Sequence, residues 1–450
     1  MAIHMPGSER HISLLGLLHT RRFTPYFLTQ FLGAFNDNVF RQALILLITS
    51  GVVTAVAPNT LNNIALFLFI LPFFLFSALA GQFADKYEKG MLIRRIKIAE
   101  LVIMLFAAVG FWFDAVWFLL GVLFCMGFQS TCFGPLKYSI MPQHLSSQEL
   151  VSGNALVQQG TYIAILLGSI TGVVLNMETA GGWWAPAGVV SLALLGYLAS
   201  RFIPEAPPAA PELPINWNLW RETLKIVSYA CEVRTVWFCI LGISWFWLLG
   251  AAYTTQLKVF VDDYLLGTEL VYALLLATFS IAIGVGSILC DKLTRENVEL
   301  GLVPIGALGV SLFSADLYFS WQGLPRADEL LTVAGFLAEP SGWRVMAGFA
   351  GIGIFGGLYI VPLFTYVQYR SRRERLARII AAVNILNALF MVMAAVMGIV
   401  FVALLGISIP GFFLLLAGLN LLVTGFLLTR VPDFLQRLAG LRSMFRDGER

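Results

Sequence analysis

The sequence predicts an all-α polytopic membrane protein with twelve transmembrane helices in two six-helix halves. Three observations predict this fold class: the composition, the spacing of apolar runs and the placement of basic residues. Hydrophobic residues make up 58% of the 450 residues and charged residues 12%, against roughly 45–50% and 25% in soluble domains. The small net charge of +3 does not indicate a nucleic-acid partner.

Apolar runs long enough to cross the hydrocarbon layer, about 20 residues each, recur along the whole chain. The first and seventh of these runs carry charges. The expected spans are 23–48, 62–82, 91–113, 116–137, 148–176, 183–202, 235–260, 270–290, 300–321, 343–366, 376–405 and 408–429.

The basic residues predict the orientation of these spans. If the spans alternate in direction, 24 of the 29 Lys and Arg residues fall on one side of the membrane. They cluster before the first span, around the loops after spans two, six, eight and ten, and in the C-terminal tail. By the positive-inside rule that side is the cytoplasm, so both termini are expected there.

A proline-rich segment divides the chain. Five prolines occur within 204–214, a density that excludes helix and favours an extended linker. The mixed apolar and charged residues that follow, 217–232, are expected to lie on the inner membrane surface. We therefore expect an N-terminal six-helix bundle (1–202), a cytoplasmic linker with a surface helix (203–234), and a C-terminal six-helix bundle with a basic tail (235–450).

The two halves resemble each other weakly, and the likeness predicts a conformational latch. At the end of span two, a glycine comes a few residues before an Asp-Lys pair. The same order of residues recurs after span eight. A parallel repeat of six spans is typical of the major facilitator arrangement. A glycine there permits close helix approach and the charges form a latch between spans, although a solvated charged loop is the simpler alternative. The predicted latch residues are Gly81, Asp85, Lys86, Asp291 and Lys292.

The first span holds the densest polar group within the membrane: Asn36, Asp37, Asn38 and Arg41. A charge at bilayer depth costs a few kcal/mol or more, so it usually faces a polar cavity or a partner. Asp37 and Arg41 are four residues apart on one helix face, where they could neutralise each other. Two interpretations stay open: a structural salt bridge, and a binding site for a charged substrate.

Other polar residues extend this candidate substrate site. Lys137 and Tyr138 follow a proline in span four and could anchor a phosphate, or could be an interfacial lysine beside a belt tyrosine. Membrane amides often only join helices. The remaining candidates are Asn154 and Gln158 in span five, Lys258 in span seven, and Asn384 and Asn387 in span eleven. Glu100 and Asp316 have no evident partner.

The sequence contains no pattern that indicates an enzyme or a cofactor. Its five cysteines lack a CxxC pair and its four histidines are scattered outside the spans, so neither a disulfide framework nor a metal site is expected. A nucleophile paired with a base is not evident either. No cofactor is therefore expected, and membrane lipids are the expected surroundings.

Several segments together resemble the bacterial lysophospholipid transporters of the major facilitator superfamily, including the version fused to an acyltransferase. The similar segments are 31–38, 81–90, 134–138, 153–156, 164–169 and 384–390. The resemblance implies a multi-pass protein of the Gram-negative inner membrane that moves lysophosphatidylethanolamine and related lysolipids to the inner leaflet for re-acylation. It also implies that Asp37 is the family's acid in span one and Lys137 its lysine in span four.

The sequence departs from that family at two places. Arg41 adds a base after the span-one acid, and the family's span-seven arginine has no clear match, Lys258 being the nearest base. We expect a monomer that works by alternating access, with Asp37 taking the ammonium of the head group and Arg41 with Lys137 or Lys258 taking the phosphate. The alternatives are a proton-coupled transporter of a soluble amphiphile, and a membrane scaffold for an acyltransferase.

Overall fold

The structure is a computed structural model that describes residues 14–50, 52, 56–175, 184–294, 299–323, 330–431 and 434. Each predicted span coincides with one long helix. These helices are α2 (Thr24–Thr49), α3 (Pro58–Lys86), α4 (Lys89–Trp112), α5 (Val116–Ser139), α7 (Glu149–Leu175), α8 (Trp184–Ser200), α10 (Arg234–Val259), α11 (Glu269–Thr294), α12 (Leu302–Ser320), α14 (Pro340–Arg370), α15 (Leu376–Met397) and α16 (Ile409–Arg430).

Shorter elements connect or extend these helices. The short α-helices are α1 (Leu14–Leu17), α6 (Met141–His144), α9 (Leu219–Cys231) and α13 (Val333–Ala338). Two π-helical turns, Phe260–Leu265 and Gly398–Leu404, continue α10 and α15. Within the described ranges the β-pairing is limited to a bridge between Gly267 and Leu331, so the fold is all-α.

The chain is a multi-pass membrane protein. In the part of the chain that the structure describes, nine helices are long and apolar enough to cross a membrane. The other three predicted spans are α2, which holds the polar group around Asp37 and Arg41, α4, which carries several charges, and α8, which has 17 residues. That these three also cross, to give twelve spans, stays a prediction.

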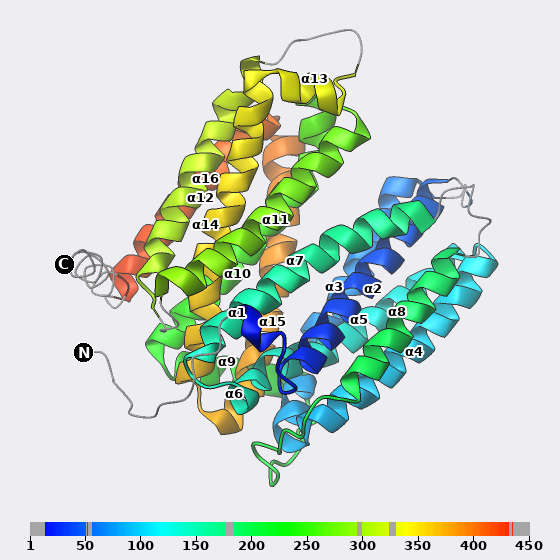
Figure 1. Cartoon of the computed structure of the whole chain (residues 1–450), viewed down its shortest axis with the longest axis vertical. Helices are drawn as coiled ribbons and strands as arrows, with labels where there is room; N and C mark the ends of the chain where they lie inside the picture. Colours follow the sequence, from blue (N-terminus) through cyan, green and yellow to red (C-terminus); the bar gives the residue numbers. More distant parts are fainter. Residues whose placement is uncertain are drawn as a thin grey trace.

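The long helices form two groups that meet at one end and diverge toward the other (Figure 1). The first group contains α2, α3, α4, α5, α7 and α8, drawn from blue to green. The second contains α10, α11, α12, α14, α15 and α16, drawn from green to red. Where the groups meet, α7 packs against α11 and α15 packs against α3 and α5. We call this the linker end, because residues 201–218 and α9 lie there.

The linker is not a loose tether. It is extended, because its prolines cannot join a helix, yet backbone hydrogen bonds attach it to the turn between α3 and α4. Ala206 N donates to Glu88 Oε1 at 2.8 Å, and Ala210 N donates to the backbone oxygen of Asp85 at 2.8 Å. Asn216 exchanges two hydrogen bonds with the Gln82 amide, at 2.8 and 3.1 Å. The linker therefore lies along the first group of helices.

Gly81 of the predicted latch and Gly286, the glycine before Asp291 and Lys292, do not have equivalent surroundings. Gly81 lies against α15, where an added Cβ would come within 2.9 Å of the Arg378 Cα atom. Gly286 instead lies against α14, and a Cβ there would be 1.9 Å from the Ile354 carbonyl oxygen. The reason is spacing, because Gly81 precedes Asp85 by four residues and Gly286 precedes Asp291 by five. Only the first glycine brings the two groups together.

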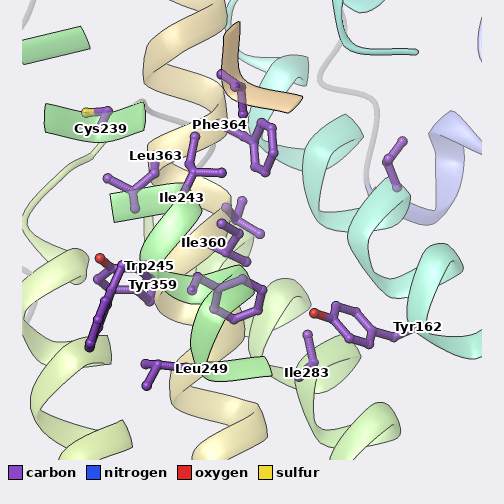
Figure 2. Packing of buried hydrophobic residues seen from close by; sticks show 14 of the residues in the cluster. Tyr162, Cys239, Ile243, Trp245, Leu249, Ile283, Tyr359, Ile360, Leu363 and Phe364 are labelled. Carbon is purple, nitrogen blue, oxygen red and sulfur yellow. The ribbon is translucent and has the colours of Figure 1, made fainter. Parts of the chain in front are cut away.

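An apolar core continues across the junction of the two groups. Figure 2 shows α14 side chains packed among residues of α10, with Ile283 of α11 beside Tyr162 of α7. The labelled members are Tyr162, Cys239, Ile243, Trp245, Leu249, Ile283, Tyr359, Ile360, Leu363 and Phe364. The junction is therefore closed by packed side chains as well as by polar contacts.

Candidate functional site

Asp37 lies midway along α2, and only one of its two carboxylate oxygens accepts a hydrogen bond from a described residue. Its Oδ2 accepts from Ser130 Oγ of α5 at 2.9 Å, and its Oδ1 has no partner among the described residues. Arg41 lies one turn further, with its guanidinium 5.2 Å from the Phe69 ring centroid. Among the residues that the structure describes, no ion pair joins Asp37 to Arg41. Of the two interpretations of these residues, the structural salt bridge is not formed in this structure.

A buried charged pair behind α2 was missed by the sequence analysis. Lys97 Nζ lies 2.6 Å from Glu100 Oε2, and both side chains are 1% exposed. Gln129 Nε2 donates to the same carboxylate at 2.9 Å, and Asn36 Nδ2 lies 3.5 Å from its other oxygen. Glu100 is thus satisfied by three groups from three helices.

The same network reaches Asp37. Ser130 Oγ, which donates to Asp37, also lies 3.2 Å from Gln129 Oε1. A continuous chain of polar side chains therefore runs from Asp37 through Ser130 and Gln129 to Glu100 and Lys97. We call these five residues, together with Asn36, the polar cluster.

The sequence groups Lys97 with the basic residues around the loop after span two, whereas the structure buries it within α4. It stands nine residues into α4, where Gly33 of α2 leaves room for it: a Cβ on Gly33 would lie 2.6 Å from Lys97 Nζ. The signal in the sequence was the spacing of three between Lys97 and Glu100, which places both on one helix face. The other acid without an evident partner, Asp316, pairs with Arg344 of α14.

Lys137, near the end of α5, makes no ion pair with a described acid. Its Nζ donates to Thr161 Oγ1 of α7 at 2.9 Å and lies 5.4 Å from the Tyr138 ring centroid. Thr161 Oγ1 in turn lies 3.3 Å from Gln30 Oε1 of α2. Among the described residues no carboxylate lies within ion-pair distance of Lys137, so its charge is available to an anion.

Tyr138 and Asn154 belong to the closed junction at the linker end. The Tyr138 ring stacks on Phe364 of α14, with centroids 4.4 Å apart and planes 12° apart. Asn154 Nδ2 donates to Thr365 Oγ1 at 3.1 Å and to Gln368 Oε1 at 2.5 Å. Gln368 Nε2 donates back to the Tyr138 carbonyl oxygen at 3.0 Å. These contacts join the two groups of helices.

Both predicted latch acids contact the opposite group, through partners that the sequence did not indicate. Asp85 of α3 is fully buried and pairs with Arg378 of α15, whose Nε lies 2.8 Å from Oδ2. The backbone N–H of Ala377 donates to the same carboxylate at 3.1 Å. Asp291 of α11 accepts from Ser152 Oγ of α7 at 2.5 Å. Each acid therefore meets the first turns of a helix in the other group.

The two predicted latch lysines take no part in these contacts. The ammonium of Lys86 lies 5.9 Å from the Tyr87 ring centroid, within the first group. Lys292 is exposed to solvent in the last turn of α11. Arg378 supplies the positive charge that Lys86 was expected to give.

Three of the remaining candidates have their side chains bonded elsewhere than to Asp37. Lys258 lies at the far end of α10, where it pairs with Asp262 and Glu269 at 2.6 Å each. Asn38 donates to Ala34 O within α2 at 2.7 Å. Asn387 contacts Ser244 Oγ of α10 at 2.9 Å. These groups bond within their own half.

Two amides lie at the junction with unused capacity. Neither side-chain atom of Gln158 has a hydrogen-bond partner among the described residues, although the residue is buried. The Asn384 Nδ2 atom is likewise unpaired there, and faces Gly134 of α5, where a Cβ would be 2.3 Å away. Both amides stay predicted substrate contacts.

Comparisons with known proteins identify the family. The Major Facilitator Superfamily matches residues 26–336. The chain belongs to this superfamily. Curated relatives named lysophospholipid transporter LplT include those of Enterobacter sp. (strain 638), 29% identical over 76% of this chain and 79% of the relative, and of Cronobacter sakazakii, 27% identical over 82% and 85%.

Solved structures of other members show the same fold. The human organic anion transporter MFSD10 (TETRAN) superposes with a TM-score of 0.72 at 15% identity, covering 90% of this chain and 99% of that one. The transporter FucP in its outward conformation superposes with a TM-score of 0.66 at 13% identity, covering 91% and 98%. The superfamily match and these relatives make the chain a transporter and not an enzyme.

Proposed function

We propose that the protein moves lysophospholipids such as lysophosphatidylethanolamine from the outer to the inner leaflet of the bacterial inner membrane. The names of the relatives and the superfamily fold support the cargo class. The observation that carries the proposal is the charge state of the first group of helices. Among the described residues no carboxylate lies within ion-pair distance of Arg41 or Lys137, and Asp37 Oδ1 has no hydrogen-bond partner.

These charges match a zwitterionic head group. Asp37 would bind the ammonium, and Arg41, four residues or about 6 Å along the helix, would take two phosphate oxygens in a forked contact. Lys137 would bind the phosphate at a second depth in the protein. Its partner Thr161 lies beside Gln30, which is seven residues or about 10 Å from Asp37 along α2. The phosphate could pass from Arg41 to Lys137 as the lysolipid moves. Lys258 is left out, because two acids already neutralise it.

The conformation fits one state of alternating access. If the basic side of the chain is cytoplasmic, the linker end and both termini face the cytoplasm, and the structure is the outward-open state. The halves 1–202 and 235–450 would then rock after the Asp85 and Asp291 contacts break. We further propose that the transporter acts as a monomer and that an acyltransferase consumes the delivered lysolipid.

The direct test is transport by the purified protein in liposomes. Inward movement of outer-leaflet lysophosphatidylethanolamine is followed for wild type, Asp37→Asn and Arg41→Ala, with Asp316→Asn and Arg344→Ala as matched controls that alter the pair between α12 and α14. We expect both site variants to lose movement and both controls to keep it. Movement by Asp37→Asn at the wild-type rate would refute the proposed site, and no movement by wild type would refute the cargo.

A second candidate function is supported by the polar cluster. Two carboxylates within the helices, Asp37 and Glu100, lie in one polar cluster, and intramembrane acids often take up and release protons in transporters. This would suit a proton-coupled transporter of a soluble amphiphile. Uptake that rises with an imposed proton gradient, without competition by lysolipid, would favour this function over the first.

A further inference from the structure

Helix α9 presents an apolar face that no described residue covers. Trp217, just before the helix, is 69% exposed, and Trp220 and Leu224 are 75% and 74% exposed. Trp220 and Leu224 are four residues apart and so lie on one side of α9. The opposite side is buried and comprises Glu222, Ile226 and Ala230. Exposed tryptophans of this kind are typical of the boundary between lipid and water.

Basic residues flank this face and indicate what covers it. Arg221 and Lys225 are exposed next to Trp220 and Leu224. A helix with aromatic and aliphatic residues on one side and lysine and arginine beside them fits the surface of a bilayer with anionic lipids. A protein partner would need an acidic rim, whereas anionic head groups occur wherever the helix can touch the membrane.

The end of α9 is connected to the closed junction. The Tyr229 ring centroid lies 4.4 Å from the Arg375 guanidinium carbon and 5.4 Å from that of Arg378. Arg375 also pairs with Glu232 at 2.7 Å. Arg378 is the residue that binds the buried carboxylate of Asp85 in the first half. A displacement of α9 would therefore remove ring contacts from both arginines at the start of α15.

We propose that α9 binds the anionic surface of the bilayer and thereby stabilises closure of the linker end. Membrane contact holds α9 against α3 and α15, and Tyr229 then keeps Arg378 positioned over Asp85. Loss of the contact shifts the protein toward opening of this end. The binding rests on α9 alone, whereas its effect on transport rests on the alternating access proposed above.

The first experiment tests binding. Cys231 is an exposed thiol at the end of α9, and it carries a fluorophore in a variant whose other four cysteines are alanine. The protein is placed in phosphatidylcholine vesicles with or without phosphatidylglycerol, and lipids with a quencher near the head group report proximity. Each basic residue near an anionic surface contributes roughly fivefold in binding. We expect stronger quenching with phosphatidylglycerol, and a loss of that increase in Arg221→Ala/Lys225→Ala.

The second experiment tests closure without any lysolipid, so its failure is distinct from a failure of the transport proposal. Thr365→Cys in a cysteine-less background places a thiol at a fully buried position of the junction. A water-soluble maleimide labels it only when the linker end opens. Trp220→Ser with Leu224→Ser should label severalfold faster than the parent, and Trp184→Ser, which alters an exposed tryptophan far along the chain, should not.

The outcomes separate the two parts of the proposal. Equal quenching in both kinds of vesicle, with no effect of Arg221→Ala/Lys225→Ala, would overturn membrane binding by α9. If quenching depends on phosphatidylglycerol but Thr365→Cys is labelled at the same rate in Trp220→Ser with Leu224→Ser as in the parent, the link between membrane binding and closure is overturned.

Discussion

Replacement of Asp85 by Asn should open the linker end. The carboxylate is fully buried, binds the Arg378 guanidinium at 2.8 Å and accepts from the Ala377 backbone N–H at 3.1 Å. Removing one partner of a buried ion pair costs about 3–5 kcal/mol, because the other charge stays buried without compensation. Asn keeps the shape and part of the hydrogen bonding, so we take about 2 kcal/mol, or roughly a 30-fold shift toward the open state. The cost falls on the closed state, since water solvates Arg378 after opening.

The labelling of Thr365→Cys measures this shift directly. In the Asp85→Asn variant the rate should rise by roughly 30-fold or reach the rate of an exposed thiol. The matched control is Asp316→Asn, which makes the same chemical change in a pair within the second half. Equal labelling rates in the two variants would refute the view that Asp85 holds the halves together.

Two further predictions concern stability. Lys97→Met leaves Glu100 buried without its cation and should lower the free energy of unfolding by about 3–5 kcal/mol. A thermal melt in detergent measures this loss, and recovery in Lys97→Met/Glu100→Leu would confirm its cause. An unchanged melting temperature in the single variant would contradict it. Gly127→Ala should lower the melting temperature, because the added Cβ would lie 2.5 Å from the Phe69 carbonyl oxygen. The control is Gly121→Ala in the same helix, whose Cβ would meet nothing within 4 Å and which should leave the melting temperature unchanged. If both glycine variants melt alike, the close approach of α3 and α5 is not the reason.

The long helices could be predicted, because an apolar run of about 20 residues indicates a membrane-spanning helix. Each expected span falls on a helix, since a backbone in lipid must satisfy its hydrogen bonds internally. A role for Asp85 in a latch between spans was predicted from a local pattern, but its position at the junction between the halves was not. Its partner was not predicted either, because Arg378 is 293 residues away and the sequence offers several arginines near it.

The site was less predictable, because charges pair across helices. Lys97 was counted with a solvated loop, since its neighbours are basic, and only packing against Gly33 and Glu100 reveals that it is buried. The spacing of Asp37 and Arg41 allows a salt bridge between them, but Ser130 of another helix binds the carboxylate. Spacing along one helix defines which side chains share a face and leaves open what that face meets.

The burial of the Asp85–Arg378 pair has a consequence for how the protein responds to ionic strength. Dissolved ions screen exposed charges over about 8 Å at physiological salt, but they act much less on a pair from which water is excluded. The neighbouring Arg375–Glu232 pair is partly exposed, with 31% and 47% of the side chains accessible. High salt should therefore loosen the attachment of α9 while the inner pair stays closed, so that a change in the ionic environment reaches the surface helix before it reaches the junction between the halves.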